Sequence, residues 1–187
     1  MSGSVDDDAL RTDQLILRRW RHSDREPFAE LNADTRVMEH FPSTLDKSRS
    51  DMFVDRIESE FAAYGWGLWA VELSATGEFI GFTGLAVQTF PAHFTPAVEI
   101  GWRLAHSAWG HGYATEAARA ALSYGFEYVG LPEIVSMTAA TNVRSQAVMR
   151  RLGMTRDPRD DFDHQKLPDG HPLRRHVLYR LAGVSFS

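Results

Sequence analysis

The stretch that most constrains the fold lies at residues 97–119, where a strand pattern, a glycine turn and a helix pattern follow one another. Between residues 98 and 104 apolar and polar side chains alternate, which is typical of a strand with two different faces. Gly110 and Gly112 then precede an alanine-rich segment whose apolar residues recur at helical spacing. Glycine and proline within residues 130–132 end that segment. The sequence therefore predicts a strand, a tight turn and a helix in immediate succession.

Such a turn is suited to binding an anion, because the first amides of a helix have no partner within the helix and carry the positive end of its dipole. Gly110 and Gly112 would let a phosphate approach those amides. The alternative is a plain turn packed under a small-residue helix. A P-loop is excluded, because no Lys-Ser/Thr pair follows Gly112. The dinucleotide fingerprint fails too, because a third glycine is missing and the nearest acid, Glu133, precedes the next strand instead of ending it.

A second motif follows the helix. It consists of Asn-Val-Arg-Ser at residues 142–145 and a helical segment that ends in Leu-Gly-Met at residues 152–154. The turn at residues 109–114 resembles the pyrophosphate loop of the GNAT superfamily of N-acetyltransferases, Arg/Gln-x-x-Gly-x-Gly/Ala, with Trp109 at the first position. The second motif resembles that superfamily's Asn-x-x-Ala/Ser segment and the Leu-Gly-Phe beyond it. The two motifs stand in the right order with one strand, residues 134–138, between them.

The resemblance covers about residues 13–182, and its first and last strands look most like the ribosomal-protein N-terminal acetyltransferase branch. It implies an α/β fold, a GNAT-like mixed, mostly antiparallel sheet of about six or seven strands, flanked by helices and splayed at the central strands. We expect residues 1–12 to form a disordered N-terminal tail and residues 13–187 to form a single N-acetyltransferase domain. Within it, Ser23 begins a capping box that predicts a helix start.

Composition narrows the possible partners. With 20 Lys and Arg against 25 Asp and Glu, the net charge of −5 does not favour nucleic acid. The chain has no cysteine, hence no disulfide, no thiol nucleophile and no zinc thiolate. No apolar run is long enough for a membrane span, and the acidic residues 1–14 do not resemble a signal peptide. We expect a cytoplasmic protein that acts on an amine acceptor, with no nucleic acid or membrane partner; a homodimer remains open.

The resemblance implies acetyl-CoA as co-substrate, with its pantetheine arm paired to the strand backbone at residues 102–104, where a free amide would stabilise the developing oxyanion. No histidine spacing indicates a metal, and we assign none. Arg144, Arg150 and Arg151 are candidates for the 3′-phosphate of coenzyme A, although a solvated helix face would also account for them. The full set of expected cofactor-binding residues is Trp102, Arg103, Leu104, Trp109, Gly110, His111, Gly112, Tyr113, Ala114, Thr115 and Asn142.

Glu99 is the first candidate for the catalytic base, because glutamate is poorly suited to a strand interior and this one precedes the expected pantetheine segment. The alternative is a solvent-facing strand position or a partner for Arg103. Many superfamily members carry a tyrosine as general acid four residues after the Ala/Ser, and here that position is Met149. Ser145 is then the remaining hydroxyl for catalysis, or else only a helix N-cap.

Two functions remain open at this point. The first is transfer of an acetyl group from acetyl-CoA to a primary amine, either a peptide or protein N-terminus or a small-molecule amine, by direct attack. The second is a non-catalytic acyl-CoA sensor or interaction module, which Met149 favours and which Glu99 and Ser145 disfavour. Three aspartates, Asp160, Asp161 and Asp163, are either part of a solvated loop or an attraction for a cationic acceptor.

Overall fold

The computed structural model describes residues 9–186, which form one mixed sheet with helices on both faces. The strands are β1 (Leu10–Arg11), β2 (Leu15–Arg18), β3 (Leu68–Leu73), β4 (Phe79–Gln88), β5 (Ala97–Leu104), β6 (Glu133–Ala139), β7 (Phe162–Asp163) and β8 (Arg175–Ala182). The α-helices are α1 (Arg25–Ala33), α2 (Lys47–Tyr64), α3 (Tyr113–Ser123) and α4 (Val143–Arg151).

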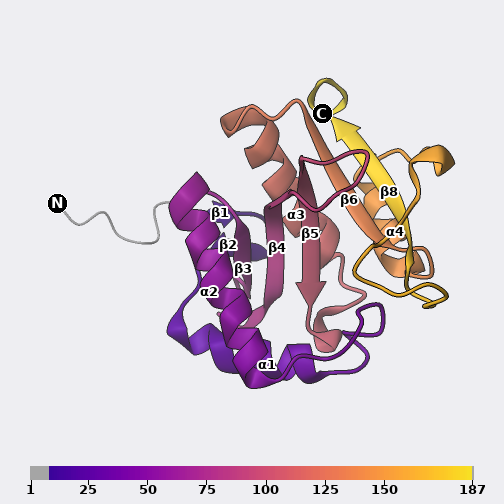
Figure 1. The fold of residues 1–187 in the computed structure, drawn as a ribbon. Coiled ribbons are helices and arrows are strands. Elements are labelled where there is room, and N and C mark those ends of the chain that lie inside the picture. The colour runs from indigo at the N-terminus through magenta and orange to yellow at the C-terminus, as the bar shows by residue number, and fades with distance from the viewer. Residues whose placement is uncertain (1–8, 187) are drawn as a thin grey trace.

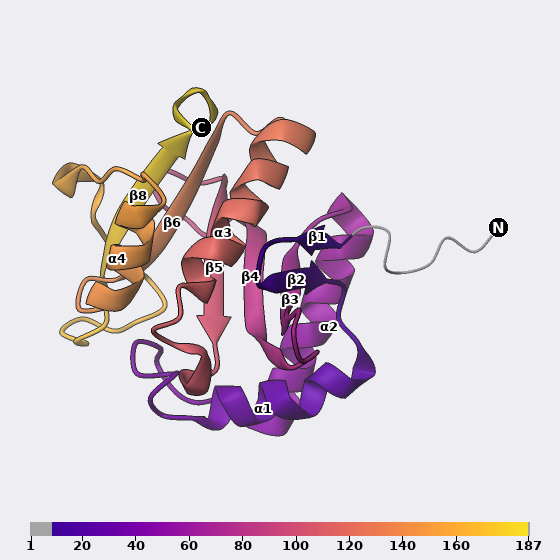
Figure 2. The ribbon, with the colours of Figure 1, turned by 180° about the vertical axis from the view of Figure 1, so that it is seen from behind.

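The sheet order is β1-β2-β3-β4-β5-β6-β8-β7, and every neighbouring pair is antiparallel except β5 and β6. Helices α1 and α2 cover one face of the sheet (Figure 1), and α3 and α4 cover the other (Figure 2). This confirms the mixed, mostly antiparallel α/β fold, with six strands of four or more residues and two short pieces that extend it.

The sheet opens between its central strands. Strand β5 pairs with β4 along its whole length, from Ala97 opposite Gln88 to Leu104 opposite Gly81. On its other side it pairs with the parallel β6 at one position, Glu99 opposite Val135. The splay expected from the sequence is therefore present, and the open edge of β5 begins just after Glu99.

The helices start and stop where side chains satisfy their ends. At the start of α2 the Asp46 carboxylate accepts a hydrogen bond from the Arg49 amide (2.8 Å), and Gly65 ends the helix with φ of 78°. The sequence offers Asp46 or Ser48 as the start of this helix and Gly65 as its end, and the structure uses Asp46 and Gly65. The helix then packs Val54, Ile57 and Phe61 against the sheet, where each is at most 4% exposed. Within residues 9–186 no helix has the length and apolar character that crossing a membrane requires.

The predicted start of the first helix is wrong by one residue, because the N-cap is Asp24 and not Ser23. Ser23 lies inside a 3₁₀ turn, His22–Asp24, and α1 begins at Arg25. The reason is a tertiary contact: the Asp24 carboxylate accepts a hydrogen bond from the Arg21 amide (2.7 Å) and is held by the buried Arg18 guanidinium.

The predicted N-terminal tail differs from the structure at its inner end. Residues 1–8 of the expected tail lie outside the described part of the chain. Leu10 and Arg11, however, form β1 and pair with Leu17 and Ile16 of β2. A turn closed by the Thr12 amide, which donates to the Leu15 carbonyl (3.0 Å), brings the two strands together.

A buried ionic cluster ties β2 to the start of α1 and to β3. The Arg18 guanidinium binds both Asp24 oxygens (2.7 and 2.9 Å), and its Nε donates to Glu72 (2.6 Å). Arg18 and Asp24 are 4% and 3% exposed. Because a single buried cation holds two carboxylates, loss of that cation should be costly.

Candidate active site

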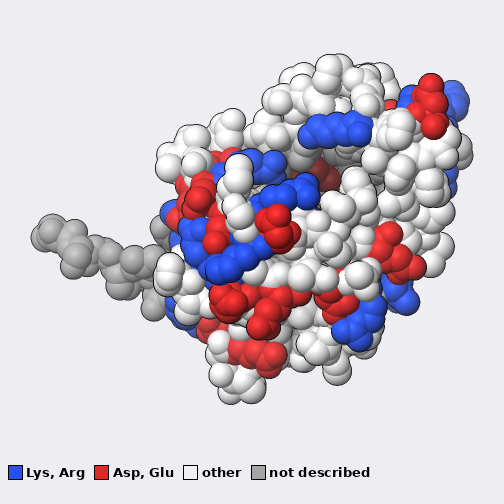
Figure 3. Space-filling model, turned by 60° about the horizontal axis from the view of Figure 1, so that its bottom comes forward, with Lys and Arg blue, Asp and Glu red and all other residues white. Residues whose placement is uncertain are grey.

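A long groove of about 1260 Å³ runs along the open side of β5. Its wall includes β5 residues, the turn before α3, the start of α4 and the connection between α1 and α2. The charged side chains that line it are mostly basic, and Figure 3 shows Lys and Arg side chains beside the hollow of this face. The basic members are Arg36, Arg56, Arg103, Arg119, Arg144, Arg151 and Lys166, against the acidic Asp13, Glu99 and Glu116.

The glycine turn has the geometry of an anion site. Gly110 and Gly112 have φ of 84° and 83°, in the left-handed region that favours glycine, and a Cβ on either would meet no heavy atom within 4 Å. The first intrahelical bond of α3 runs from the Glu116 amide to the Gly112 carbonyl (3.0 Å). The amides of residues 113–115 therefore lie ahead of the helical ladder, in a turn that lines the groove.

The open edge of β5 has its own stabilising contact. Where the β5–β6 pairing stops, the Ser136 hydroxyl donates a hydrogen bond to the Ile100 carbonyl (2.9 Å). Beyond it, the backbone of residues 101–104 borders the groove. Gly101 would place a Cβ in open space there. An extended amide-containing chain fits this edge as an added strand would.

Glu99 lies in the groove next to the point where the strands part. Its side chain is half-buried, and its Oε2 accepts a hydrogen bond from the Gln88 side chain (2.7 Å). Burial raises the pKa of the Glu99 carboxyl to about 7, although hydrogen bonds from the Met137 backbone and Gln88 act in the opposite direction. A carboxyl with this pKa is suited to accept a proton near neutral pH.

One alternative for Glu99, a pair with Arg103, is wrong in this structure. Arg103 Nη1 instead donates to the Asn32 side-chain oxygen of α1 (2.6 Å). The guanidinium lies over the ring of Phe41, 4.2 Å from its centroid. Its side chain faces α1 and α2, because Glu99, Gly101 and Arg103 share one face of β5. The side chain of Arg103, and not only its backbone, therefore belongs to the groove.

Asn142 and Ser145 are bonded to each other. Asn142 caps α4, since its side-chain oxygen accepts from the Ser145 amide (3.1 Å). Its amide group donates to the Ser145 hydroxyl (3.1 Å) and to Thr138 (3.0 Å). The N-cap is thus Asn142 and not Ser145, whose hydroxyl lines the groove. Met149, at the position of the superfamily's tyrosine, is 1% exposed.

The other residues expected to bind the cofactor do not all line the groove. Trp109 donates its indole N–H to the Leu104 carbonyl (3.0 Å) and lies under the Arg144 guanidinium, 4.9 Å away. His111 is exposed and stacks on Tyr113, with 5.3 Å between ring centroids, and it does not line the groove. Of the three arginines expected near the 3′-phosphate, Arg144 and Arg151 line the groove and Arg150 does not.

Three partners of the site escape the sequence analysis. Gln88 reaches Glu99 diagonally across β4 and β5, Asn32 reaches Arg103 from α1, and Ser136 reaches Ile100 from β6. No sequence signal identifies them, because each depends on strand register or helix docking. The place of the Arg103 side chain in the groove could be predicted from the sequence, because strand alternation puts it on the same face of β5 as Glu99.

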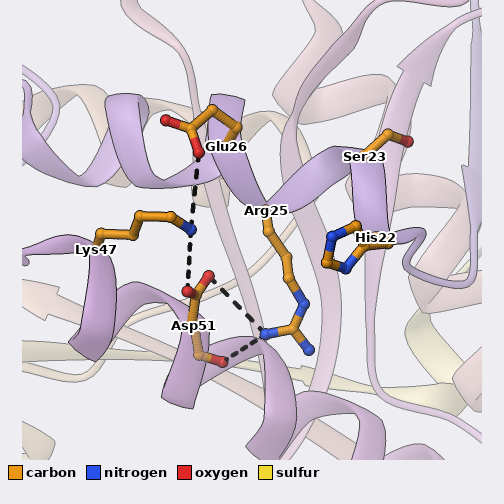
Figure 4. Close-up of a pocket in the computed structure, with 6 residues that line it drawn as sticks. All are labelled: His22, Ser23, Arg25, Glu26, Lys47 and Asp51. Carbon is orange, nitrogen blue, oxygen red and sulfur yellow. Dashed lines mark hydrogen bonds and ion pairs between the residues drawn. The ribbon is translucent and has the colours of Figure 1, made fainter.

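A smaller pocket of about 420 Å³ lies between the starts of α1 and α2. Figure 4 shows its charged side chains pairing with one another. Lys47 lies 3.7 Å from Glu26 and 3.0 Å from Asp51, and Arg25 lies 3.8 Å from Asp51. These charges join the two helices. In the described part of the chain, no three His, Cys, Asp or Glu side chains are grouped as a metal site would require.

Comparison with known proteins agrees with this geometry. The family model of the GNAT acetyltransferase domain matches residues 14–155. The FsC-acetyl coenzyme A-N(2)-transacetylase of Aspergillus fumigatus is 35% identical over 154 residues, which cover 78% of this chain and 64% of that protein.

Solved structures share the fold. An acetyltransferase from Agrobacterium tumefaciens is 29% identical with a TM-score of 0.75, covering 97% of this chain and 96% of that one. RimL, a ribosomal-protein α-N-acetyltransferase solved with coenzyme A, has a TM-score of 0.75 at 16% identity, covering 94% of this chain and 98% of its own. The chain therefore belongs to the GNAT acetyltransferase family and is an acetyl-CoA-dependent N-acetyltransferase.

Proposed function

We propose that the protein acetylates a primary amine, a peptide or protein N-terminus or a small-molecule amine, by direct attack of the amine on the thioester. The observation that carries this proposal is the position of Glu99, a carboxyl with a pKa of about 7 that lies in the groove beside the open edge of β5. When bound, acetyl-CoA supplies the acetyl group as a thioester. With no cysteine in the chain, a cysteine acyl-enzyme is excluded.

Each part of the groove has a proposed task. The amides of residues 113–115 hold the pyrophosphate, and the β5 backbone beyond Ile100 holds the pantetheine arm and donates to the thioester oxygen. Glu99 takes the amine's proton, directly or through a water molecule. The new N–C bond forms as the C–S bond breaks, and the Ser145 hydroxyl donates a hydrogen bond to the departing thiolate.

A thiol-release assay tests the proposal, with N-terminal peptides, polyamines and amino acids as acceptors. We expect acetyl-CoA-dependent release of coenzyme A with at least one class, and mass spectrometry should show a gain of one acetyl group on the amine. Tight binding of acetyl-CoA without turnover on any acceptor of the panel would argue against catalysis and for a sensor.

Substitution of Gly112 by alanine should weaken acetyl-CoA binding at least tenfold, roughly 1.4 kcal/mol. The added methyl group points into open space of the groove, where it would keep the pyrophosphate from the amides. Alanine at positive φ also costs ~1–2 kcal/mol of stability, so a control with equal strain is needed. Gly65, which ends α2, provides it, with φ of 78° and likewise no atom near a Cβ.

Calorimetric titration of acetyl-CoA into Gly112→Ala and Gly65→Ala separates the two effects. Both variants should melt at lower temperature, and only Gly112→Ala should bind acetyl-CoA more weakly. Equal affinities in the two variants would contradict the assignment of the pyrophosphate to this turn.

Substitution of Ser145 by alanine should lower kcat by no more than about tenfold, because a thiol with a pKa near ~8.5 leaves without full protonation. The cap of α4 should remain, since the Asn142 side chain accepts from the backbone amide of residue 145. Steady-state kinetics and a melting curve check both points. A drop of 10³ would instead identify the Ser145 hydroxyl as an essential acid.

A further inference from the structure

Arg103 is a half-buried cation whose Nε is fully buried, and it has no carboxylate partner among residues 9–186. One of its N–H groups is bonded to the neutral side chain of Asn32 (2.6 Å), and its Nε is buried without an acceptor. Burial, with a smaller contribution from Arg56, lowers the pKa of the guanidinium to about 10, so the group is still charged at neutral pH. A buried charge without a counterion is costly to a fold. An arginine kept in this state points to an anion that comes from outside the chain.

Three neighbouring arginines of the groove differ in this respect, whereas Arg119 and Arg151, which have no carboxylate partner among the described residues, are exposed to water. Arg36 is paired with Asp34 (2.7 Å), Arg56 with Glu60 (3.7 Å) and Arg144 with Glu39 (3.6 Å). Their charges are compensated within the protein. The charge of Arg103 is not, although its side chain is more enclosed than theirs.

The position of Arg103 assigns it to the amine acceptor and not to the phosphates of coenzyme A. Its side chain bonds to Asn32 of α1, on the face of the sheet that α1 and α2 cover. The glycine turn leads into α3, which lies on the opposite face (Figures 1 and 2). Glu99 lies on the same face of β5, and Gly101 between them leaves the floor of the groove open. An acceptor lying along this floor would reach both side chains.

The acidic loop does not offer a matching site for a cationic acceptor. Asp160 is bonded to Arg180, Asp161 to Arg156, and Asp163 to Arg175. None of the three aspartates lines the groove. Their charges are already compensated, so the interpretation that this loop attracts a cationic acceptor loses its support.

We propose that the acceptor amine carries a carboxylate, which pairs with Arg103 while the amine lies at Glu99. Asn32 occupies Nη1, and the guanidinium edge formed by Nε and Nη2 is left for a carboxylate, which matches that edge with two parallel hydrogen bonds. Phe41, which covers the guanidinium and is 37% exposed, is the side chain that moves to admit it.

The distance between Glu99 and Arg103 along β5 further limits the class of acceptor. Four residues along a strand separate the Cα atoms of Glu99 and Arg103 by ~13 Å, at roughly 3.3 Å per residue. This separation suits an acceptor whose amine and carboxylate lie several bonds apart better than an α-amino acid, whose two groups share one carbon. A peptide N-terminus with a glutamate or aspartate at its second or third residue can reach both side chains, since an extended residue spans ~3.3–3.6 Å.

This inference rests on the proposed acetyl transfer. Matched peptides allow a failure of the inference to be distinguished from a failure of the proposed function. The acceptors are C-terminally amidated tetrapeptides that differ only in glutamate, glutamine or lysine at one of those positions. For each, kcat/KM and the affinity for the protein with coenzyme A are measured in the parent, Arg103→Met and Arg103→Lys. The ratio of two peptides within one variant does not depend on the fraction of active protein.

We expect the parent to prefer glutamate over glutamine at least tenfold and lysine least of all. In Arg103→Met the glutamate/glutamine ratio should fall to about one. Arg103→Lys keeps the charge but cannot form two parallel hydrogen bonds to a carboxylate, so its ratio should lie between those of the parent and Arg103→Met. Equal ratios in the parent and Arg103→Met, or a parent that prefers lysine, would overturn the inference. If no peptide is acetylated, the proposed acetylation of peptides is wrong. The glutamate/glutamine ratio of affinities, compared between the parent and Arg103→Met, then tests the preference for a carboxylate in the same way.

Discussion

Glu99→Gln is expected to lower kcat by ~10²–10⁴, the usual range for loss of a general base. The substitution keeps the size of the side chain and an oxygen for the Gln88 hydrogen bond, and it removes only the basicity. The KM for acetyl-CoA should stay near its parent value, because the proposed cofactor contacts lie farther along β5 and at the turn before α3.

The pH dependence gives the sharper readout. Below the pKa of about 7 the Glu99 carboxyl is protonated and cannot accept a proton, so the parent rate should rise as the pH passes through this value. In Glu99→Gln the rate should follow only the neutral fraction of the amine, and the loss should shrink at high pH. A variant whose kcat lies within threefold of the parent, with the parent's pH profile, would remove Glu99 from the mechanism.

The same pKa predicts that Glu99 costs stability when it is charged. The unfolded carboxyl has a pKa near ~4.3, and the folded one about 7. Between these values the folded state holds a proton that the unfolded state has lost, so the free energy of unfolding falls as pH rises through this window. Glu99→Gln should therefore melt at a higher temperature than the parent at pH 8 and at nearly the same temperature at pH 4. A lower melting temperature at pH 8 would contradict the buried-carboxylate account.

Arg18→Met is expected to lower the free energy of unfolding by ~3–5 kcal/mol, the range for breaking a buried ion pair from one side. Methionine fills much of the space of the side chain, but Asp24 loses its guanidinium and Glu72 keeps only the half-exposed Arg21 at 3.0 Å. Denaturant unfolding followed by fluorescence measures the change, provided that the m-value is unchanged.

The matched control is the next residue in the chain. Arg19 also pairs with a glutamate, Glu58 (2.6 Å), but the two side chains are 36% and 35% exposed. Arg19→Met should cost at most about 1 kcal/mol because water screens an exposed pair. If the two substitutions cost the same, the cluster around Arg18 does not hold β2, β3 and α1 together.

Local signals in the sequence predict the elements that local contacts determine. Asp46 and Gly65 set the limits of α2, and the alternation of residues 98–104 predicts β5. The start of α1 and the short β1 could not be predicted in this way. The first depends on the bond between Asp24 and Arg18, and the second on pairing of Leu10 with Leu17 across a turn.

The candidate site likewise contains residues that local sequence signals predict and residues whose roles depend on tertiary contacts. The glycine turn and Glu99 have sequence signals, because a turn at positive φ needs glycine and a glutamate is unusual in a strand interior. The motif allows two roles for the Asn142 side chain, a cofactor contact or a structural turn, and the structure uses both of its amide hydrogens within the protein. That assignment depends on where Thr138 and Ser145 lie, which motif spacing does not specify.

The opening between β5 and β6 predicts that the protein's lifetime depends on the supply of acetyl-CoA. The sheet has an edge in its interior, where backbone groups beyond Glu99 are left without the neighbouring strand. A co-substrate that pairs with this edge binds the native state alone and adds ~2.7 kcal/mol at a hundred times its dissociation constant. Amide hydrogens at this edge should then exchange with deuterium more slowly as acetyl-CoA is added. A cell low in acetyl-CoA would hold a larger share of this protein in states open to proteases.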